Sequence, residues 1–228
     1  MKDLRPIKGK FYIAGLIAEG EHEHQDFKHS ISDARKIARS ISAFANNDGG
    51  RLLIGVKDDG AIAGVRDEED IFVVEQAAQM YCSPEVELTF TAFRVEGAQT
   101  VIRAEIARSE VRPVRVIEAD GRVRAYYRVA DENIVAHPLM VRMWESEREG
   151  VLLRMGDAER RIASLLDNRR ERPMSVDEIA RGAHISQRTA EDAIVRLAGM
   201  GVVGFAYSGG SFGIILTDSD EATADTPR

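Results

Sequence analysis

Four charged residues near the N-terminus have the types and spacing of a divalent-metal site: Glu21, Asp26, Lys28 and Asp58. Carboxylates are preferred ligands of Mg²⁺ and Mn²⁺, and a nearby lysine can stabilise the charge that develops when a phosphodiester is cut. On a strand, Asp26 and Lys28 project from the same face while Phe27 points into the core. Glu21 has an odd spacing from Asp26, so these two carboxylates converge only if the chain bends between them. The four residues are therefore candidates for a nuclease, with Lys28 as the charge-stabilising group.

The segments that follow must position this cluster. Residues 32–45 carry apolar side chains at helical spacing, with Ser30 or Ser32 available as the N-cap. After an Asn/Asp/Gly-rich turn comes a short apolar strand at 51–56, which ends in a tight turn that contains Asp58. If the strand that carries Asp26 pairs with 51–56, Asp58 can reach a neighbouring position.

Helical and strand patterns alternate up to about residue 150. They predict helices over 67–81 and 138–147, and strands over 86–93, 100–107, 114–117 and 123–129. The predicted fold class is α+β, with a mixed or antiparallel sheet packed with helices. We expect this domain to cover residues 1–150, close to the commonest domain size.

A compact helical pattern replaces this alternation after residue 150. It predicts helices over 157–166, from residue 175 and over 186–200, followed by a β-hairpin of 201–205 and 212–216. Ser175 and Glu178 form a capping box at the start of the second of these helices. The order of elements is that of a winged helix-turn-helix. We expect a small winged-helix domain over residues 151–217 and a disordered acidic tail over 218–228.

The third helix of a helix-turn-helix enters the major groove and touches bases with its first residues. The candidates here are Gln187, Arg188 and Thr189, with Arg196 placed for phosphate or flank contact. Glutamine and arginine can each make two hydrogen bonds to a purine edge. Glu191 and Asp192 count against the assignment, because they would meet phosphates unless they turn away. The alternative is a module that packs, dimerises or docks a protein partner.

The amino-acid composition excludes some classes of protein for this chain. The net charge of -7 argues against coating nucleic acid by bulk attraction, although residues 151–205 are nearly neutral and can present a basic face. Cys82 is the single cysteine, so the chain has no internal disulfide framework. No apolar run in the sequence approaches the roughly 20 residues that cross a bilayer. We expect a soluble, cytoplasmic protein.

Several motifs occur together in one order along the chain. They are Glu21-x4-Asp26-Phe27-Lys28, then Ser42-Ala43-Phe44-Ala45-Asn46 ahead of Gly49-Gly50, then Ile54-Gly55-Val56-Lys57-Asp58-Asp59-Gly60, and finally Tyr126-Tyr127-Arg128-Val129. This combination resembles the Schlafen-type AlbA-like domain, and the similarity covers roughly residues 10–145. Two positions depart from the family pattern. Asp26 replaces the usual Glu, and Ala130 stands where a Gly often follows.

The resemblance implies two activities. In Schlafen ribonucleases three acidic residues bind the metal that cuts tRNA or rRNA, and the motifs match them to Glu21, Asp26 and Asp58. In most bacterial relatives the domain is described as DNA-binding or ATP-binding, often beside a winged helix in transcriptional regulators. Schlafen catalytic units enclose RNA with two copies of the domain, so a chain with one copy implies a homodimer.

We therefore expect a nucleic-acid-binding protein that acts as a DNA-binding transcriptional regulator and homodimer, with DNA favoured and RNA possible. Arg51 and Lys57 are further candidates for contact with nucleic acid. For this role the sequence predicts no certain cofactor. The alternative is an endoribonuclease that depends on Mg²⁺ or Mn²⁺ and acts on structured RNA, and a second alternative is a protein-interaction scaffold.

Overall fold

The structure is a computed structural model that describes residues 4–31, 33–65, 69–95, 97, 99–149, 155–170 and 172–217. It divides into two compact units, with the division between Ala136 and His137. The expected disordered tail at 218–228 lies outside the described residues. No helix in the described ranges is long and apolar enough to cross a membrane.

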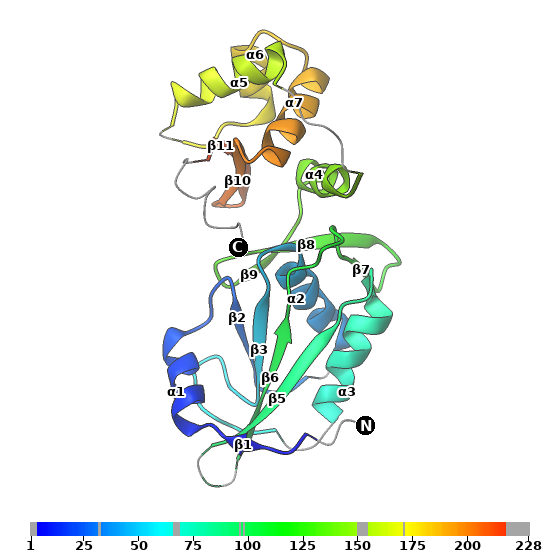
Figure 1. Ribbon diagram of the computed structural model, residues 1–228, viewed down its shortest axis with the longest axis vertical. Coiled ribbons are helices and arrows are strands. Elements are labelled where there is room, and N and C mark those ends of the chain that lie inside the picture. The colour runs from blue at the N-terminus through cyan, green and yellow to red at the C-terminus, as the bar shows by residue number, and fades with distance from the viewer. Residues whose placement is uncertain are drawn as a thin grey trace, which may run out of the picture. The chain divides into compact units, whose positions relative to one another are not determined.

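A five-stranded mixed sheet forms the centre of the first unit (Figure 1). Its strands, in spatial order, are β1 (Ile7–Lys8), β5 (Leu88–Arg94), β6 (Thr100–Ile106), β3 (Gly50–Ile54) and β2 (Gln25–Lys28). The two outer pairs, β1 with β5 and β2 with β3, are parallel, whereas the inner pairs are antiparallel. Asp26 lies opposite Leu52 in the pairing of β2 with β3.

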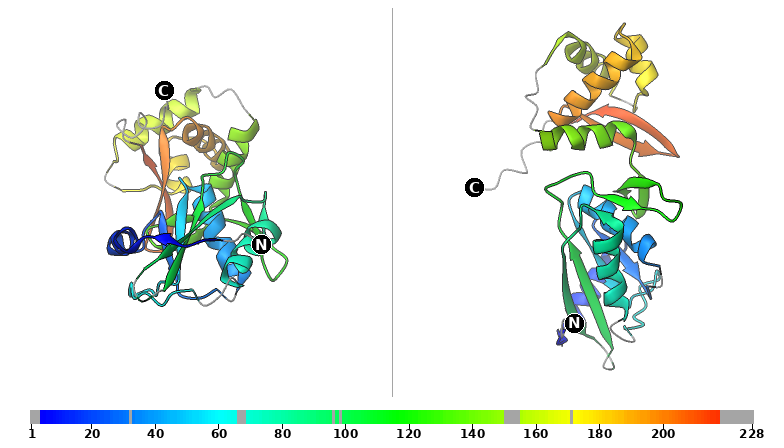
Figure 2. Two further views of the ribbon diagram at one scale, coloured as in Figure 1. Left: turned by 60° about the horizontal axis from the view of Figure 1, so that its bottom comes forward. Right: turned by 90° about the vertical axis from the view of Figure 1, so that its right-hand side faces the viewer.

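Helices cover both faces of this sheet. On one face lie α2 (Ala34–Asn46), α3 (Glu69–Gln76) and the π-helical turn η1 (Ala77–Tyr81), while α1 (Lys10–Glu19) lies on the other, as the views in Figures 1 and 2 show. Fully buried Ile41 and Phe44 of α2 pack on the sheet in the larger core cluster. On the α1 side, Ile13 packs with Phe27 and Leu53 in a smaller core. Because successive side chains of a strand point to opposite faces, Phe27 faces α1 and Asp26 faces α2.

A second sheet is antiparallel and contains β4 (Cys82–Ser83), β7 (Arg115–Ile117), β8 (Val123–Val129) and β9 (Glu132–Val135). The end of α2 binds it through buried Asn46, whose Nδ2 donates to the carbonyl oxygens of Val114 (2.9 Å) and Tyr126 (2.8 Å). Asn46 Oδ1 also accepts from Val114 N at 2.7 Å. Asn47 makes a similar pair of bonds with the backbone of Arg128. The two asparagines therefore join the helix to the second sheet.

The second unit contains four helices and one hairpin among its described residues. They are α4 (Pro138–Glu149), α5 (Asp157–Asp167), α6 (Val176–Gly182), α7 (Gln187–Gly199), β10 (Val203–Ser208) and β11 (Ser211–Leu216). Ser175 caps α6 in the expected capping box with Glu178, and Ser186 caps α7. Leu139 of α4 packs in the same core as Ile162 of α5 and Ile194 of α7.

The predicted α+β fold class is confirmed by these mixed and antiparallel sheets and their covering helices. Two details differ from the expectations. The helix predicted from residue 32 begins after Asp33, whose carboxylate accepts from the backbone N–H groups of Arg35 and Lys36, so Asp33 is the N-cap in place of Ser30 or Ser32. The helix over 138–147, expected within a domain of residues 1–150, packs in the second unit because its apolar face joins that core.

Candidate functional site

A tight turn at the start of β2 brings Glu21 back alongside the strand. His22 and Gln25 exchange two backbone hydrogen bonds, of 3.0 and 3.1 Å, which reverse the chain. Glu21 Oε1 then accepts from the backbone N–H of Phe27 at 2.8 Å. This turn is the bend that the odd spacing of Glu21 and Asp26 requires.

Asp26 is buried and is surrounded by hydrogen-bond donors and positive charge. Its Oδ2 lies 2.7 Å from Lys28 Nζ, and Ser40 Oγ of α2 donates to the same oxygen at 3.3 Å. Its Oδ1 lies 3.5 Å from Nη2 of Arg128, whose side chain is fully buried. Both oxygens of the carboxylate therefore face a cation already within the protein.

Arg128 of β8 holds the turn that carries Glu21. Its guanidinium donates to the carbonyl oxygens of His22 (3.0 Å) and Gln25 (3.1 Å) and to Asn133 Oδ1 (3.1 Å). The guanidinium also lies 4.9 Å from the centre of the Phe44 ring, a cation–π distance. Sequence reasoning named the Tyr126–Val129 motif without giving Arg128 a role. An arginine in a buried strand is itself a signal, because such a charge has to be paired.

The environment moves the pKa values of the two carboxyl groups in opposite directions. Burial raises the pKa of Glu21, and its hydrogen bond with Asp26 adds to the rise. Burial opposes ionisation of Asp26 too, but its hydrogen bond with Glu21 and the charges of Lys28 and Arg128 hold its pKa below the ordinary value. Glu21 therefore keeps a proton more readily than Asp26. A carboxyl pair with separated pKa values can give and take a proton.

Asp58 is not gathered into this cluster. It is exposed in a turn closed by hydrogen bonds from Gly60 N to Lys57 O (2.8 Å) and from Lys57 N to Ala61 O (3.0 Å). Asp26 lies opposite Leu52, whereas Asp58 follows Leu52 by six residues and comes after the end of β3. Across the part of the chain that the structure describes, no group of three or more His, Cys, Asp or Glu side chains could hold a metal ion. The expected set of Glu21, Asp26 and Asp58 is thus not assembled.

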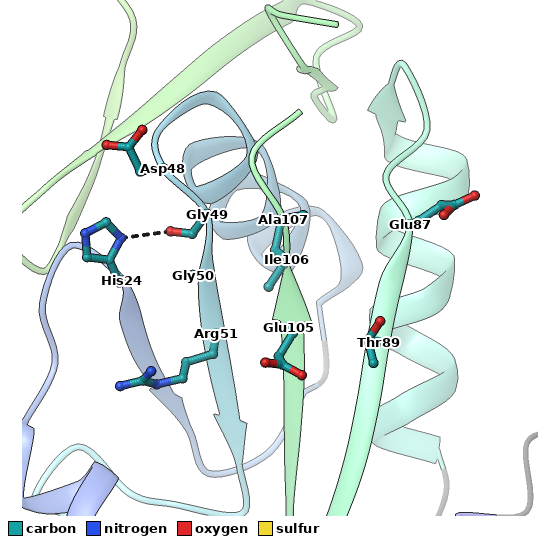
Figure 3. A pocket seen from close by; sticks show the side chains of 10 residues that line it. All are labelled: His24, Asp48, Gly49, Gly50, Arg51, Glu87, Thr89, Glu105, Ile106 and Ala107. Atoms are coloured by element: carbon teal, nitrogen blue, oxygen red, sulfur yellow. Dashed lines mark hydrogen bonds between the residues drawn. The ribbon is translucent and has the colours of Figure 1, made fainter. Parts of the chain in front are cut away.

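The two basic candidates of the first unit differ in their surroundings. Arg51 donates to Gln25 Oε1 at 2.7 Å and pairs with Glu19 at 2.5 Å, so its charge is already compensated. Lys57 is exposed beside Asp58. Arg51 also lines a cavity of about 520 Å³, in which His24 Nδ1 lies 3.0 Å from the carbonyl oxygen of Gly49 (Figure 3). Three carboxylates share that cavity, namely Asp48, Glu87 and Glu105.

In the second unit, the first turn of α7 presents the predicted base-reading residues to solvent. Gln187, Arg188 and Thr189 are all exposed. Gln187 Nε2 donates to Glu191 at 3.3 Å, and the Thr189 hydroxyl lies 2.7 Å from Ser186 Oγ. Arg188 has no ion pair or side-chain hydrogen bond within the described ranges.

Farther along α7, charged residues are engaged within the protein. Arg196 pairs at 2.6 Å with Glu159, a buried residue of α5 that also accepts from the backbone N–H of Gly156. Arg142 of α4 contacts Asp192 and lies 3.7 Å from Glu191. Arg196 therefore has a structural partner, and the two acidic side chains share one cation.

The part of the chain that contains the Glu21–Asp26 pair matches a known family. The family described as "Schlafen, AlbA_2" matches residues 21–137, just over half of the 228 residues. No curated protein sequence matches this chain. Among solved structures, the crystal structure of the DIP2311 protein from Corynebacterium diphtheriae is similar at 19% identity and a TM-score of 0.43. That match covers 87% of this chain, which spans about a third (36%) of the other.

Proposed function

Because the chain belongs to the Schlafen AlbA_2 family, we propose that it binds nucleic acid and acts as a DNA-binding transcriptional regulator, with α5–α7 and the β10–β11 hairpin serving as a winged helix-turn-helix. The observation that carries this proposal is the exposed, unpaired Arg188 in the first turn of α7. It lies beside Gln187, and these two residue types can each bond two atoms of a purine edge in the major groove.

The charges around α7 support the same assignment. Glu191 and Asp192 would repel phosphates, but Arg142 lies against both and offsets part of this repulsion. The proposal also includes a homodimer, since two copies would present two α7 helices to paired half-sites about 34 Å apart.

Duplex DNA affinity measured against salt concentration tests this function. The protein should bind, and Arg188→Ala should weaken binding by about tenfold, which corresponds to the loss of a bidentate contact worth roughly 1–3 kcal/mol. Arg94→Ala removes the same charge from an exposed position on β5 and serves as the matched control. Absence of binding, or equal affinities for wild type and Arg188→Ala, would remove the proposed readout.

A second candidate is an endoribonuclease that depends on Mg²⁺ or Mn²⁺ and acts on structured RNA. Its support is the contact of Asp26 with Glu21 and Lys28, two carboxyl groups and a cation at one point. The carboxylates present do not fit a three-ligand metal site, because Asp58 lies apart and both Asp26 oxygens face cations. Mn²⁺-dependent cleavage that Asp26→Ala abolishes, measured at a temperature at which circular dichroism shows the variant to be folded, would establish this activity, because Asp26 also pairs with buried Arg128. If the protein neither cleaves RNA nor binds nucleic acid, the remaining candidate is a protein-interaction scaffold.

A further inference from the structure

The second unit holds exposed arginines that its own carboxylates do not neutralise. Most of the acidic side chains near α5–α7 are already in ion pairs. These pairs are Asp157–Arg160, Glu159–Arg196, Asp167–Arg170, Glu178–Arg172 and Asp192–Arg142. Within the described ranges, this pairing leaves four exposed arginines without a carboxylate: Arg161, Arg169, Arg181 and Arg188. Asp177 is an exposed carboxylate without an ion pair in the same ranges, so these four arginines still leave a local excess of positive charge.

One of these arginines lines a groove between α5 and the turn that joins α6 to α7. The groove has a volume of about 500 Å³. Its lining residues are Arg160, Arg161, Ser164, Leu165, Asn168, Gly182, Ala183 and His184. None of them is acidic. Arg160 already pairs with Asp157, and the Asn168 amide donates to the carbonyl oxygen of Ser164 at 2.8 Å. The guanidinium of Arg161 and the imidazole of His184 are hydrogen-bond donors of the kind that contact phosphate oxygens.

The shape of the groove depends on a close approach of α5 to α6. A Cβ atom on Gly182 would lie 2.7 Å from Cδ2 of Leu165, so a larger residue here would require the Leu165 side chain to shift. The next residues, Ala183 and His184, turn the chain toward α7, with Ala183 buried and His184 exposed at a φ of 53°. The exposed imidazole thus stands at the edge of the groove.

The outward side of α7 offers no comparable surface for a phosphate backbone. At 100° per residue, Val195 lies on the side of the helix opposite to Ala190, Ala193 and Leu197, which face the three-helix core. It is nevertheless only 6% exposed, because it packs in the same cluster as Leu139 of α4. Helix α4 therefore covers this side of α7 beyond its first turn.

We propose that the groove between α5 and the α6–α7 turn binds the phosphodiester backbone of a nucleic-acid duplex, with Arg161 as its central contact. This inference rests on the proposed function and adds a position for the backbone. The first turn of α7 reads bases, and the groove fixes the register of the duplex by contacts that carry no sequence information. Duplex DNA and duplex RNA share this backbone chemistry.

The experiment measures the affinity of the full chain for one labelled duplex, prepared as DNA and as RNA, from low to high salt. Arg161→Ala should weaken binding to unrelated sequences equally and reduce the slope of log K against log salt by about one unit. Arg161→Glu should weaken binding further, whereas Arg161→Lys should retain most of it. Arg94→Ala is the charge-matched control. Because Arg161 is exposed and has no partner in the described residues, unchanged melting temperatures should show that the variants fold.

The outcomes separate the two proposals. If the wild type binds neither duplex at low salt, the proposed function fails and this inference fails with it. If Arg188→Ala weakens binding but Arg161→Ala and Arg161→Glu bind like wild type, the function stands and the groove is not the backbone site. If the wild type and all variants bind one of the two duplexes more tightly, that duplex, DNA or RNA, is the one whose backbone the groove contacts.

Discussion

Oδ1 of Asp26 lies 3.5 Å from Nη2 of Arg128, and both side chains are buried between β2, α2 and β8. This pair joins the strand that carries Asp26 to the second sheet of the first unit. It also explains why the Tyr126–Val129 motif accompanies the acidic motif in one domain. The arginine from one motif neutralises the carboxylate of the other.

Replacement of Asp26 by Asn should therefore destabilise the first unit. The substitution leaves the Arg128 charge buried without its counter-charge, a change that costs about 3 kcal/mol or more when a buried pair is broken. Urea denaturation of the full chain measures the loss. Asp58→Asn, in the exposed turn, should change stability by less than about 0.5 kcal/mol. Equal midpoints for wild type and Asp26→Asn would contradict the structural role of the pair.

Gly50→Ala should destabilise the junction of α2 with β3. A Cβ atom at this position would lie 2.2 Å from Cδ1 of Phe44, which is fully buried and cannot move freely. We expect a loss of about 1–3 kcal/mol from overpacking, measured by urea denaturation. Gly15→Ala in α1 is the control, because nothing lies within 4 Å of its added Cβ atom. There the greater helix propensity of alanine should leave stability unchanged or raise it by up to about 1 kcal/mol.

Ala130→Gly should stabilise the protein. Ala130 has a φ of 51°, in the left-handed region where a side chain is strained, at the position where the family pattern often has glycine. Removing the Cβ atom should raise the stability of the first unit by about 0.5–1 kcal/mol after the entropic cost of glycine in the unfolded chain is included. A lower melting temperature for this variant would show that the side chain makes a favourable contact that outweighs the strain.

Acidification should weaken the second unit through His137. Burial lowers the pKa of this imidazole from its usual 6.5, although Glu191 opposes the shift. Its Nδ1 accepts from the backbone N–H of Leu139 at 3.2 Å, and its ring stacks on Phe212 with centroids 3.8 Å apart. Because the folded state binds this proton more weakly than the unfolded state, the stabilisation is present above the unfolded pKa and is lost as pH falls through the folded one. Calorimetry between pH 7.5 and 5.5 should show this loss, and His137→Asn should reduce it.

Arg188 and Arg196 should differ in what their replacement changes. Arg196→Ala leaves the buried Glu159 carboxylate without its cation, so the second unit should lose about 1–3 kcal/mol of stability. Arg188→Ala should leave the melting temperature unchanged and reduce duplex affinity. A variant of Arg196 as stable as wild type would show that the backbone hydrogen bonds of Glu159, among them the one from Gly156, satisfy its carboxylate without the cation.

Local patterns predicted most of the regular elements, because their signals lie within a few residues. The Ser175–Glu178 capping box and the alternation of Asp26, Phe27 and Lys28 are of this kind. Helix α1 was not predicted. It has no side-chain cap, and it carries Phe11 at 87% exposure, so it lacks a clear apolar stripe.

The functions of Asn46 and Arg128 could not be predicted from spacing. Asn46 lies 68 and 80 residues from its partners Val114 and Tyr126, and Arg128 lies 103 residues from Gln25. The sequence pattern of the Asn/Asp/Gly segment predicts only a turn. Its asparagines are in addition the contacts between that helix and a sheet formed much later in the chain.

The position of α4 decides where this chain can be cut. A fragment that starts at residue 151, where the sequence suggests a boundary, would lack Leu139 and Arg142. Val195 would then meet water, and the charges of Glu191 and Asp192 would be left unbalanced beside it. Such a fragment should aggregate. A fragment that starts at His137 retains α4 packed on α7 and should stay monodisperse. A separate fragment of the second unit should therefore begin at His137, which is also the last residue of the family match.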